Sequence, residues 1–330
     1  PPPNGNDRMK AYVYGANGAA ITEVAKPSPK GAQVLVRVHA CGLNRADLGM
    51  TKGHAHGAAG GAGTVLGMEW AGEIAEVGPD ARGVKAGDKV MGSGSAAFAE
   101  YTLADHGRLF RTPSNMNFEE ACTLPIALST MHNAVVTNGA LQAGQTVLIQ
   151  GASSGVGLMA LQIAKLKGAS LVIGSSTDPA RRGRLKEFGA DLAVDSSDPG
   201  WVDQVLQATS GEGVDLIVDQ VSGKVASQNL KATRIKGRIV NVGRLGGTHA
   251  DFNFDLHAAR RISYIGVTFR SRTIEEIREI FDEVRKDIWP AVESRKLQLP
   301  IDKVFAFDDI GKAFEHMEAN KHLGKIVVTL

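Results

Sequence analysis

The segment 146–165, TVLIQGASSGVGLMALQIAK, constrains the fold of this chain more than any other part of it. A short apolar strand turns through glycines and serines directly into an apolar helix, whose free backbone N–H groups suit a dinucleotide pyrophosphate. The general G-x-G-x-x-G positions fall on Ala152, Ser154 and Gly157, so two glycines are replaced and the strand–turn–helix context carries the interpretation. A glycine-containing turn without a ligand is the alternative. The residues predicted to bind a cofactor here are Ala152, Ser153, Ser154, Gly155, Val156 and Gly157.

Strands and helices alternate after this turn, which predicts a parallel, doubly wound sheet. The expected strands are apolar throughout, as in a sheet that helices cover on both faces. They are 171–176, 192–195, 214–223, 237–243 and 261–269, and the expected helices are 180–190 and 201–210.

The chain on either side of this region has a different pattern. Short alternating runs indicate a mostly antiparallel β domain with almost no helix before residue 118; these runs are 11–15, 33–42, 72–78 and 87–92. The C-terminal part is expected to return to that domain with a helix over 273–288 stopped at Pro290, a strand over 303–307, a helix over 308–320 and a strand over 325–330. The predicted domains are 9–127 together with 267–330, and 128–266.

Composition argues against several other classes of protein. The chain has 37 Lys and Arg and 35 Asp and Glu, a formal net charge of +2, so there is no electrostatic case for binding nucleic acid or an anionic membrane. Two cysteines allow no disulfide framework. No apolar run reaches the ~18 residues of a membrane span, and the start before Met9 lacks the apolar stretch of a signal peptide. We expect a cytoplasmic protein.

The end of the second strand of the predicted sheet selects the cofactor. Enzymes that use NAD usually place an acid there to bind the ribose 2′-hydroxyl. Here Ser175 and Ser176 end the strand, and Arg181 and Arg182 open the next helix, a combination suited to a 2′-phosphate. Asp178 is a contrary sign, although it lies one turn late. We predict NADPH, with NADH and simply solvated arginines as the alternative.

A set of motifs runs through nearly the whole chain: CGLNRADL (41–48), LGMEWAGEIAEVG (66–78), GDKVMG (87–92), FAEY (98–101), GQTVLIQGASSGVG (144–157) and HLGKIVVTL (322–330). In these motifs and their order the chain resembles the medium-chain dehydrogenases/reductases, in the branch of the zeta-crystallin-like quinone oxidoreductases. The resemblance implies an α/β protein with a GroES-like, mostly-β catalytic domain and a doubly wound parallel Rossmann domain.

The resemblance also implies that the chain binds no zinc. Zinc-dependent relatives carry Cys at the position of Asn44 and His at the position of Met68, and the amide and thioether found here are poor zinc ligands. Glu69 remains, but one carboxylate does not hold zinc alone. His54 and His56 form the best other metal candidate, although solvent-facing loop histidines are favoured because the sequence places no third ligand.

In the family the nicotinamide lies in the cleft between the two domains, which places Asn44, Asp47, Met68 and Thr130 near it. Asn44 is the candidate donor of a hydrogen bond to a substrate carbonyl that gains charge on reduction, with turn stabilisation as its alternative. Asp47 is either a proton relay or, as we favour, a structural partner of local backbone groups.

Two further segments enter through the resemblance. The loop 241–247, NVGRLGG, is expected to border the nicotinamide, through Val242 and Gly243. Lys325 is expected to lie near the adenosine phosphate. The strand predicted over 261–269 forms dimers in relatives, so a homodimer is expected.

The four tyrosines, Tyr12, Tyr14, Tyr101 and Tyr264, lie in expected strands or at strand edges, so none is an obvious proton donor. A reaction that needs little acid catalysis suits such a site. The prediction is an NADPH-dependent reductase that transfers hydride to a quinone or similar conjugated carbonyl. An enone or ketone reductase is the first alternative, and an NADPH-binding protein with little catalysis is the second.

Overall fold

The computed structural model describes residues 7–56 and 60–330. The N-terminal tail before Asp7 and residues 57–59 of the Gly/Ala-rich loop 53–64 lie outside the described residues. The chain divides into two compact units. The first contains the chain up to Ile126 together with Phe269–Glu293 and Leu299–Leu330; the second contains Ala127–Thr268 with Ser294–Gln298.

The second unit is built on a six-stranded sheet in which every neighbouring pair is parallel. Its strands are β9 (Thr146–Gln150), β10 (Leu171–Ser175), β11 (Leu192–Val194), β12 (Val214–Asp219), β13 (Thr233–Asn241) and β14 (Ser263–Gly266). They lie in the order β11-β10-β9-β12-β13-β14, so the chain runs outward from β9 in one direction and then returns to continue from β12 in the other. This order confirms the predicted doubly wound Rossmann sheet. Its topological switch point lies between β9 and β12, where such sheets bind ligands at the carboxyl ends of the strands.

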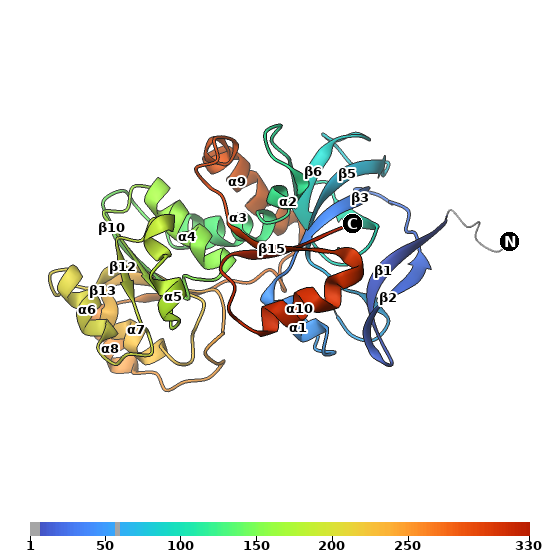
Figure 1. Ribbon diagram of the computed structural model, residues 1–330. Coiled ribbons are helices and arrows are strands. Elements are labelled where there is room, and N and C mark those ends of the chain that lie inside the picture. The colour runs from blue at the N-terminus through green and yellow to red at the C-terminus, as the bar shows by residue number, and fades with distance from the viewer. Residues whose placement is uncertain (1–6, 57–59) are drawn as a thin grey trace. The chain divides into compact units, whose positions relative to one another are not determined.

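Helices pack on both faces of this sheet, with α4 on one side and α6 on the other in Figure 1. The helical segments are α3 (Pro125–His132), the π-helix Asn133–Asn138, α4 (Gly155–Leu166), α5 (Pro179–Arg182), α6 (Trp201–Ala208), α7 (Ala226–Ala232) and α8 (Phe254–Arg260). Trp201, Ile217 and Ile239 are among the fully buried side chains of one core cluster.

The single helix predicted over 180–190 is wrong. The structure has α5 (Pro179–Arg182) and a separate 3-10 turn, Leu185–Phe188. Gly183, a poor helix former, ends α5. Leu185 is the only residue of the second turn that is buried, so little apolar contact favours continuing the helix.

The first unit contains two mostly antiparallel sheets, which confirms the predicted GroES-like, mostly-β domain. The smaller one has β1 (Arg8–Gly15), β2 (Gly18–Ala25) and β4 (Thr64–Val65). The larger one has β3 (Gln33–Gly42), β5 (Glu69–Val77), β6 (Lys89–Ser93), β7 (Tyr101–Asp105), β8 (Leu109–Arg111), β15 (Ile301–Ala306) and β16 (Lys325–Thr329). β3 is central because it pairs with β5, β7 and β16, which brings the C-terminal strand beside the motif that follows residue 41.

The first unit also contains α1 (Arg45–Met50), α2 (Phe118–Ala121), α9 (Ile274–Glu293), the 3-10 turn Phe307–Asp309 and α10 (Ile310–Glu318). The sequence did not predict α1, which has only six residues and so is too short to show a helical period. The Asp47 carboxylate caps its start by accepting from the Asn44 N–H at 2.8 Å, and the buried Met50 anchors its end.

The prediction that the long helix stops at Pro290 is also wrong, because α9 continues to Glu293. Ala291 and Val292 are buried after the proline, and the ring of Trp289 lies 5.0 Å from that of Phe110. Packing of this last turn outweighs the backbone hydrogen bond that the proline removes.

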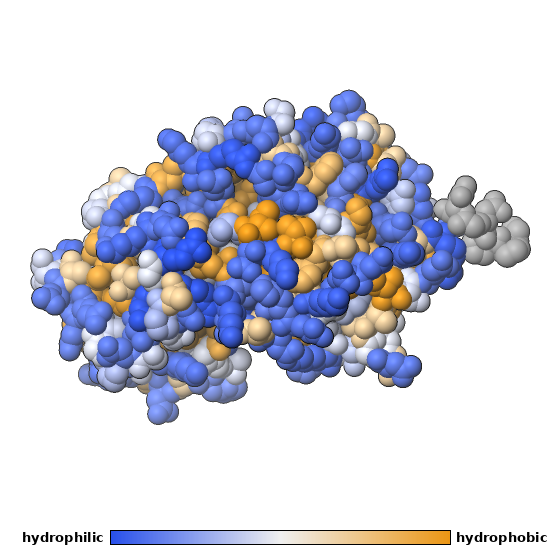
Figure 2. All heavy atoms as spheres, in the orientation of Figure 1, coloured by the Kyte–Doolittle hydropathy of each residue, from blue (hydrophilic) through white to orange (hydrophobic). Residues whose placement is uncertain are grey.

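Within the described ranges, no helix is long and apolar enough to cross a membrane. Figure 2 shows a mainly hydrophilic face with hydrophobic residues in scattered groups.

Candidate functional site

The turn between β9 and α4 has the geometry of an anion-binding loop. Gly151 leaves the strand with φ +74°, a left-handed backbone that glycine adopts without strain. Ser154 is the N-cap of α4, and its Oγ accepts a hydrogen bond from the Gly157 N–H at 3.0 Å. A Cβ on Gly157 would overlap the carbonyl oxygen of Gly151 and lie 2.8 Å from the carbonyl carbon of Ala152. Only glycine lets the helix start so close to the strand end.

Sequence reasoning missed Gly151 as a residue of this site. The fingerprint alignment starts at Ala152, whereas the left-handed turn is made one residue earlier. The signal for it was the glycine directly after the strand TVLIQ, since strand-to-turn positions with positive φ favour glycine.

A chain of buried hydrogen bonds joins the carboxyl ends of β9, β10 and β12 below the turn. Ser175 Oγ accepts from the Gly151 N–H at 3.0 Å and donates to Gln150 Oε1 at 2.6 Å. Gln150 Nε2 then donates to Asn229 Oδ1, and Asn229 Nδ2 donates to Asp219 Oδ2, both at 2.9 Å. The side chains of this network hold the turn after β9 at a fixed place on the sheet.

Asp219 ends this network and holds the loop that follows β12. Its Oδ1 accepts from the backbone N–H groups of Val221 and Ser222 at 2.8 and 2.9 Å. Burial raises the pKa of Asp219, and these hydrogen bonds and the one from Asn229 oppose the rise. The three donors fix the carboxyl group at the switch point of the sheet.

The loop after β13 lies against the end of β12. The N–H groups of Val242 and Gly243 donate to the Asp219 carbonyl at 2.9 and 3.1 Å. Ser222 Oγ donates to the Gly243 carbonyl at 2.6 Å, which ties the two loops together. Val242 and Gly243 are therefore in the same unit and on the same sheet edge as the turn after β9.

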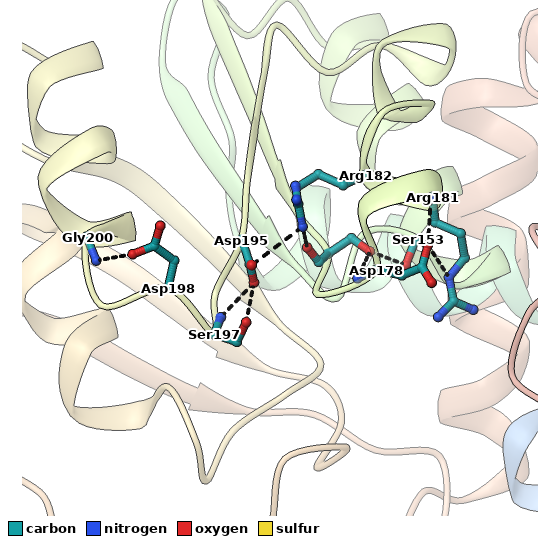
Figure 3. Close-up of polar contacts among 9 residues, drawn as sticks. Ser153, Asp178, Arg181, Arg182, Asp195, Ser197, Asp198 and Gly200 are labelled. Atoms are coloured by element: carbon teal, nitrogen blue, oxygen red, sulfur yellow. Dashed lines mark hydrogen bonds and ion pairs between the residues drawn. The ribbon is translucent and has the colours of Figure 1, made fainter.

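Polar side chains gather at the end of β10 (Figure 3). Ser153 Oγ from the turn after β9 and Ser176 Oγ, directly after β10, are 2.9 Å apart. Arg182 Nη1 donates to the Ser176 carbonyl at 3.0 Å and lies 3.6 Å from Asp195 Oδ2. The hydroxyls and a guanidinium thus surround the strand end where an NAD-selective acid would stand.

The carboxylate of Asp178 caps the N-terminus of α5. As the N-cap it accepts from the Arg181 N–H at 2.8 Å, and the Arg181 Nε lies 3.8 Å from the same carboxylate oxygen. The hydrogen bond from the Arg181 backbone and the charges of Arg181 and Arg182 lower the pKa of Asp178. Arg181 therefore lies in α5 with a carboxylate beside it, and its role at the cofactor stays a prediction.

A second polar cluster lies in the first unit, around α1. Asn44 Nδ2 donates to Glu69 Oε1 at 3.2 Å, and Lys325 Nζ lies 2.9 Å from both Asn44 Oδ1 and Glu69 Oε1. The Asn44 N–H donates to Asp47 Oδ2 at 2.8 Å. Asn44, Asp47, Glu69 and Lys325 are thus brought together, although Asn44 and Lys325 are 281 residues apart in sequence.

Asp47 is fully buried within this cluster. Burial raises its pKa to about 7, against the effects of the Asn44 hydrogen bond and of Lys325, while Glu69 raises it further. In the described part of the chain, Asp47 Oδ1 has no hydrogen-bond partner. Asp47 therefore takes up a proton near neutral pH.

The other predicted residues are placed as follows. Lys325, expected near the adenosine phosphate, has its ammonium held by Glu69 and Asn44, so its role at the cofactor stays a prediction. Met68 is partly buried and packs on the core of the first unit. Thr130 lies in α3 within the second unit. In the described ranges, no three His, Cys, Asp or Glu side chains are grouped to hold a metal ion.

Comparison with known proteins agrees with this architecture. The family described as alcohol dehydrogenase GroES-like domain matches residues 30–114, and the family described as zinc-binding dehydrogenase matches residues 155–286. Quinone oxidoreductase-like protein 2 of Mus musculus is 30% identical over 312 residues, which cover 94% of this chain and 88% of that protein. The crystal structure of CurK enoyl reductase has a TM-score of 0.85 at 25% identity and covers 98% of this chain and 99% of its own.

A longer relative matches as well. A phenolphthiocerol/phthiocerol polyketide synthase of Mycobacterium tuberculosis is 30% identical over 312 residues, or 94% of this chain. The chain spans only 14% of the length of that relative.

The chain belongs to the medium-chain dehydrogenase/reductase superfamily, which confirms the resemblance seen in its motifs. It is similar to quinone oxidoreductases and to an enoyl reductase, and its family implies a nicotinamide dinucleotide cofactor.

Proposed function

We propose that this chain is an NADPH-dependent reductase that transfers hydride to a quinone or similar conjugated carbonyl without zinc. The observation that carries the proposal is the end of β10, where Ser153, Ser176 and the arginines of α5 lie. Of the two acids nearby, Asp178 caps α5 and Asp195 lies 3.6 Å from Arg182. Serine hydroxyls and guanidinium groups are donors that match phosphate oxygens.

The turn and strand ends fit a dinucleotide phosphate. The N–H groups at the start of the 12-residue α4 and the close approach allowed by Gly157 support pyrophosphate binding. The residues that would hold the cofactor are Ala152, Ser153, Ser154, Gly155, Val156, Gly157, Ser175, Ser176, Arg181, Val242 and Gly243. When bound, NADPH supplies the hydride.

Asn44 is the proposed hydrogen-bond donor to the acceptor oxygen. Such a donor stabilises the oxygen as it becomes negative, by an amount that raises the rate about 10²–10³-fold in comparable sites. Met68, in the first unit, is proposed to form a wall of the acceptor site. For Thr130, in the second unit, a place near the nicotinamide stays a prediction. A quinone suits these residues because its reduced oxygen is a stabilised phenolate that water protonates.

The positions of the four tyrosines support an acceptor whose reduction needs no tyrosine as proton donor. Tyr12 and Tyr14 lie in β1, Tyr101 begins β7, and Tyr264 lies in β14. Burial raises the pKa of Tyr264 to about 12, with Asp219 adding to the rise. Such a phenol is a weak acid at neutral pH.

Zinc independence is proposed from the donor set. Asn44 and Met68 offer an amide and a thioether where a catalytic zinc needs thiolate, imidazole or carboxylate ligands. We expect the purified protein to contain less than a stoichiometric amount of zinc by elemental analysis. Its turnover should be unchanged after dialysis against a chelator; loss of activity that zinc restores would contradict this.

An enoyl reductase is the second candidate, favoured by the likeness to CurK enoyl reductase over 98% of this chain. Both candidates share the cofactor site and differ in the acceptor. An acceptor panel with NADPH therefore separates them: an ortho-quinone such as 9,10-phenanthrenequinone, a simple enone, and a saturated ketone as control. Rapid NADPH loss with the quinone supports the first proposal, whereas turnover of the enone alone supports the second.

We also propose a homodimer formed through β14. This strand pairs with β13 at the end of the six-stranded sheet, so it offers backbone groups to a second copy. Equilibrium sedimentation should give twice the chain mass of 34.8 kDa. A monomer at micromolar concentration would refute this.

A further inference from the structure

The ammonium group of Lys325 is almost completely buried. Its side chain is 4% exposed, that of its partner Glu69 is 0% exposed, and the two charged atoms are 2.9 Å apart. Glu69 Oε2 accepts from the Ile126 N–H at 2.7 Å, so both carboxylate oxygens are fixed. Gly42 crowds the same carboxylate, since a Cβ on that glycine would lie 2.7 Å from Glu69 Oε1. This ion pair is rigid and shielded from solvent.

The ion pair determines which way the Asn44 amide faces. Oδ1 lies 2.9 Å from the Lys325 ammonium, and Nδ2 lies 3.2 Å from the Glu69 carboxylate. A flipped amide would place two donors together at the lysine and two acceptors together at the glutamate. The charges on both sides therefore exclude the flipped amide.

This orientation leaves one hydrogen on Nδ2 available. Among the described residues, Nδ2 donates only to Glu69, and a carboxamide nitrogen carries two hydrogens. Asn44 is only partly buried, whereas Glu69 and Lys325 are enclosed, so Asn44 is the member of this trio that solvent reaches.

We propose that Lys325 and Glu69 are positioning residues that hold the Asn44 carboxamide in one orientation, with its second N–H directed to the acceptor oxygen. The inference rests on the proposed function, because it assigns the pair to the donor that reduction of a carbonyl requires. Two other roles for Lys325 compete with this one: a ligand of the cofactor phosphate, and an ion pair that only stabilises the fold.

The test uses the double variant Lys325→Met/Glu69→Gln, because removing the lysine alone would leave a buried unpaired carboxylate. The new amide at position 69 still accepts from the Ile126 N–H, but it can pair with either face of Asn44. Asn44→Ala is the second variant, and the combination of all three changes completes a double-mutant cycle. Lys52→Met is the matched control, since Lys52 makes an exposed ion pair with Glu318 at 2.6 Å in the same unit.

We expect the double variant to bind NADPH within about twofold of the unaltered protein while kcat for the ortho-quinone falls about 10–100-fold. Asn44→Ala should lower kcat to a similar extent. In the combined variant, kcat should be little lower than in the double variant alone. Lys52→Met should leave both the Kd for NADPH and kcat unchanged. A tenfold weaker Kd for NADPH with kcat retained would overturn the proposal in favour of phosphate binding. Unchanged kcat, or additive losses, would overturn it in favour of a purely structural pair.

A readout without turnover separates this inference from the proposed function. The side-chain amide of Asn44, assigned by NMR from its loss in Asn44→Ala, should give one pair of sharp signals that shift and broaden in the double variant. Unaltered signals would overturn the positioning role. The unaltered protein could reduce neither quinone nor enone while the amide signals respond as expected. That result would contradict the proposed function but support the positioning of the Asn44 amide by Lys325 and Glu69.

Discussion

Gly157 and Gly151 approach so closely that a Cβ on Gly157 would overlap the Gly151 carbonyl oxygen. The contact sets the height of the α4 N-terminus above the sheet edge, and thereby the distance of its N–H groups from a bound phosphate. Gly157 has no positive φ, so steric contact, not backbone strain, is the reason that it is glycine.

Gly157→Ala should therefore weaken cofactor binding by pushing α4 away from the turn. We expect the Kd for NADPH, measured by fluorescence titration, to rise at least about fivefold, since overpacking costs about 1–3 kcal/mol. Gly183→Ala is the control, because a Cβ there would make an ordinary contact of 3.5 Å with the Pro179 carbonyl. An equal rise in the Kd for NADPH in Gly157→Ala and Gly183→Ala would contradict the steric explanation for Gly157.

Arg181→Ala should reduce the preference for NADPH over NADH. A charged hydrogen bond to the 2′-phosphate contributes about 1.5–3 kcal/mol, so the ratio of the two kcat/KM values should fall about 10–100-fold. Lys186→Ala removes an exposed positive charge from the next turn and serves as the control. If both substitutions lower the ratio equally, the effect is only general electrostatic attraction.

Asn229→Ala should destabilise the second unit by breaking the buried network. It leaves Gln150 Nε2 and Asp219 Oδ2 without their partner, and each buried unsatisfied group costs about 1–3 kcal/mol. We expect the free energy of unfolding in urea to fall by about 2–5 kcal/mol. Gln142→Ala, at an exposed hydrogen bond to Ala140, should change it by less than ~0.5 kcal/mol. A fall no greater than in this control would show that the network adds no stability.

Asp47 should make stability depend on pH. Its pKa is about 7 in the folded protein and 3.8 in the unfolded chain, so between these values the folded state binds more protons. The free energy of unfolding then decreases as pH rises from about 4 to 7, with a slope of up to ~1.4 kcal/mol per pH unit from this group. Asp47→Asn keeps an oxygen to cap α1 and should remove this slope. Parallel curves of melting temperature against pH for the two proteins would contradict the assignment.

The Rossmann sheet could be predicted from sequence because its strands are apolar throughout and alternate with helices. The segment 146–165 specifies both the strand and the start of α4 through local chemistry alone. Helix α1 was not predicted because the hydrogen bond from the Asn44 N–H to the Asp47 carboxylate stabilises its start more than apolar periodicity does. The last turn of α9 was not predicted because it is stabilised by tertiary packing. Burial of Val292 outweighs the local effect of Pro290 on the helix.

Part of the candidate site could likewise be predicted from the sequence, and part could not. The turn residues were visible as a contiguous motif, whereas the cluster of Asn44, Glu69 and Lys325 depends on β16 pairing with β3 across almost the whole sequence. Long-range pairing of this kind leaves no periodic signal. The network from Gly151 to Asp219 was invisible for the same reason, because its members come from three strands and a helix.

The measurement that tests the account most directly is kcat/KM for NADPH and for NADH with the same ortho-quinone at one ionic strength. The serines and arginines at the end of β10 predict rapid turnover with NADPH and a preference of at least about 100-fold over NADH, consistent with one or two charged hydrogen bonds to a phosphate. Equal constants for the two cofactors, or turnover with NADH alone, would contradict the proposed phosphate site. No turnover with either would contradict the proposed reductase activity.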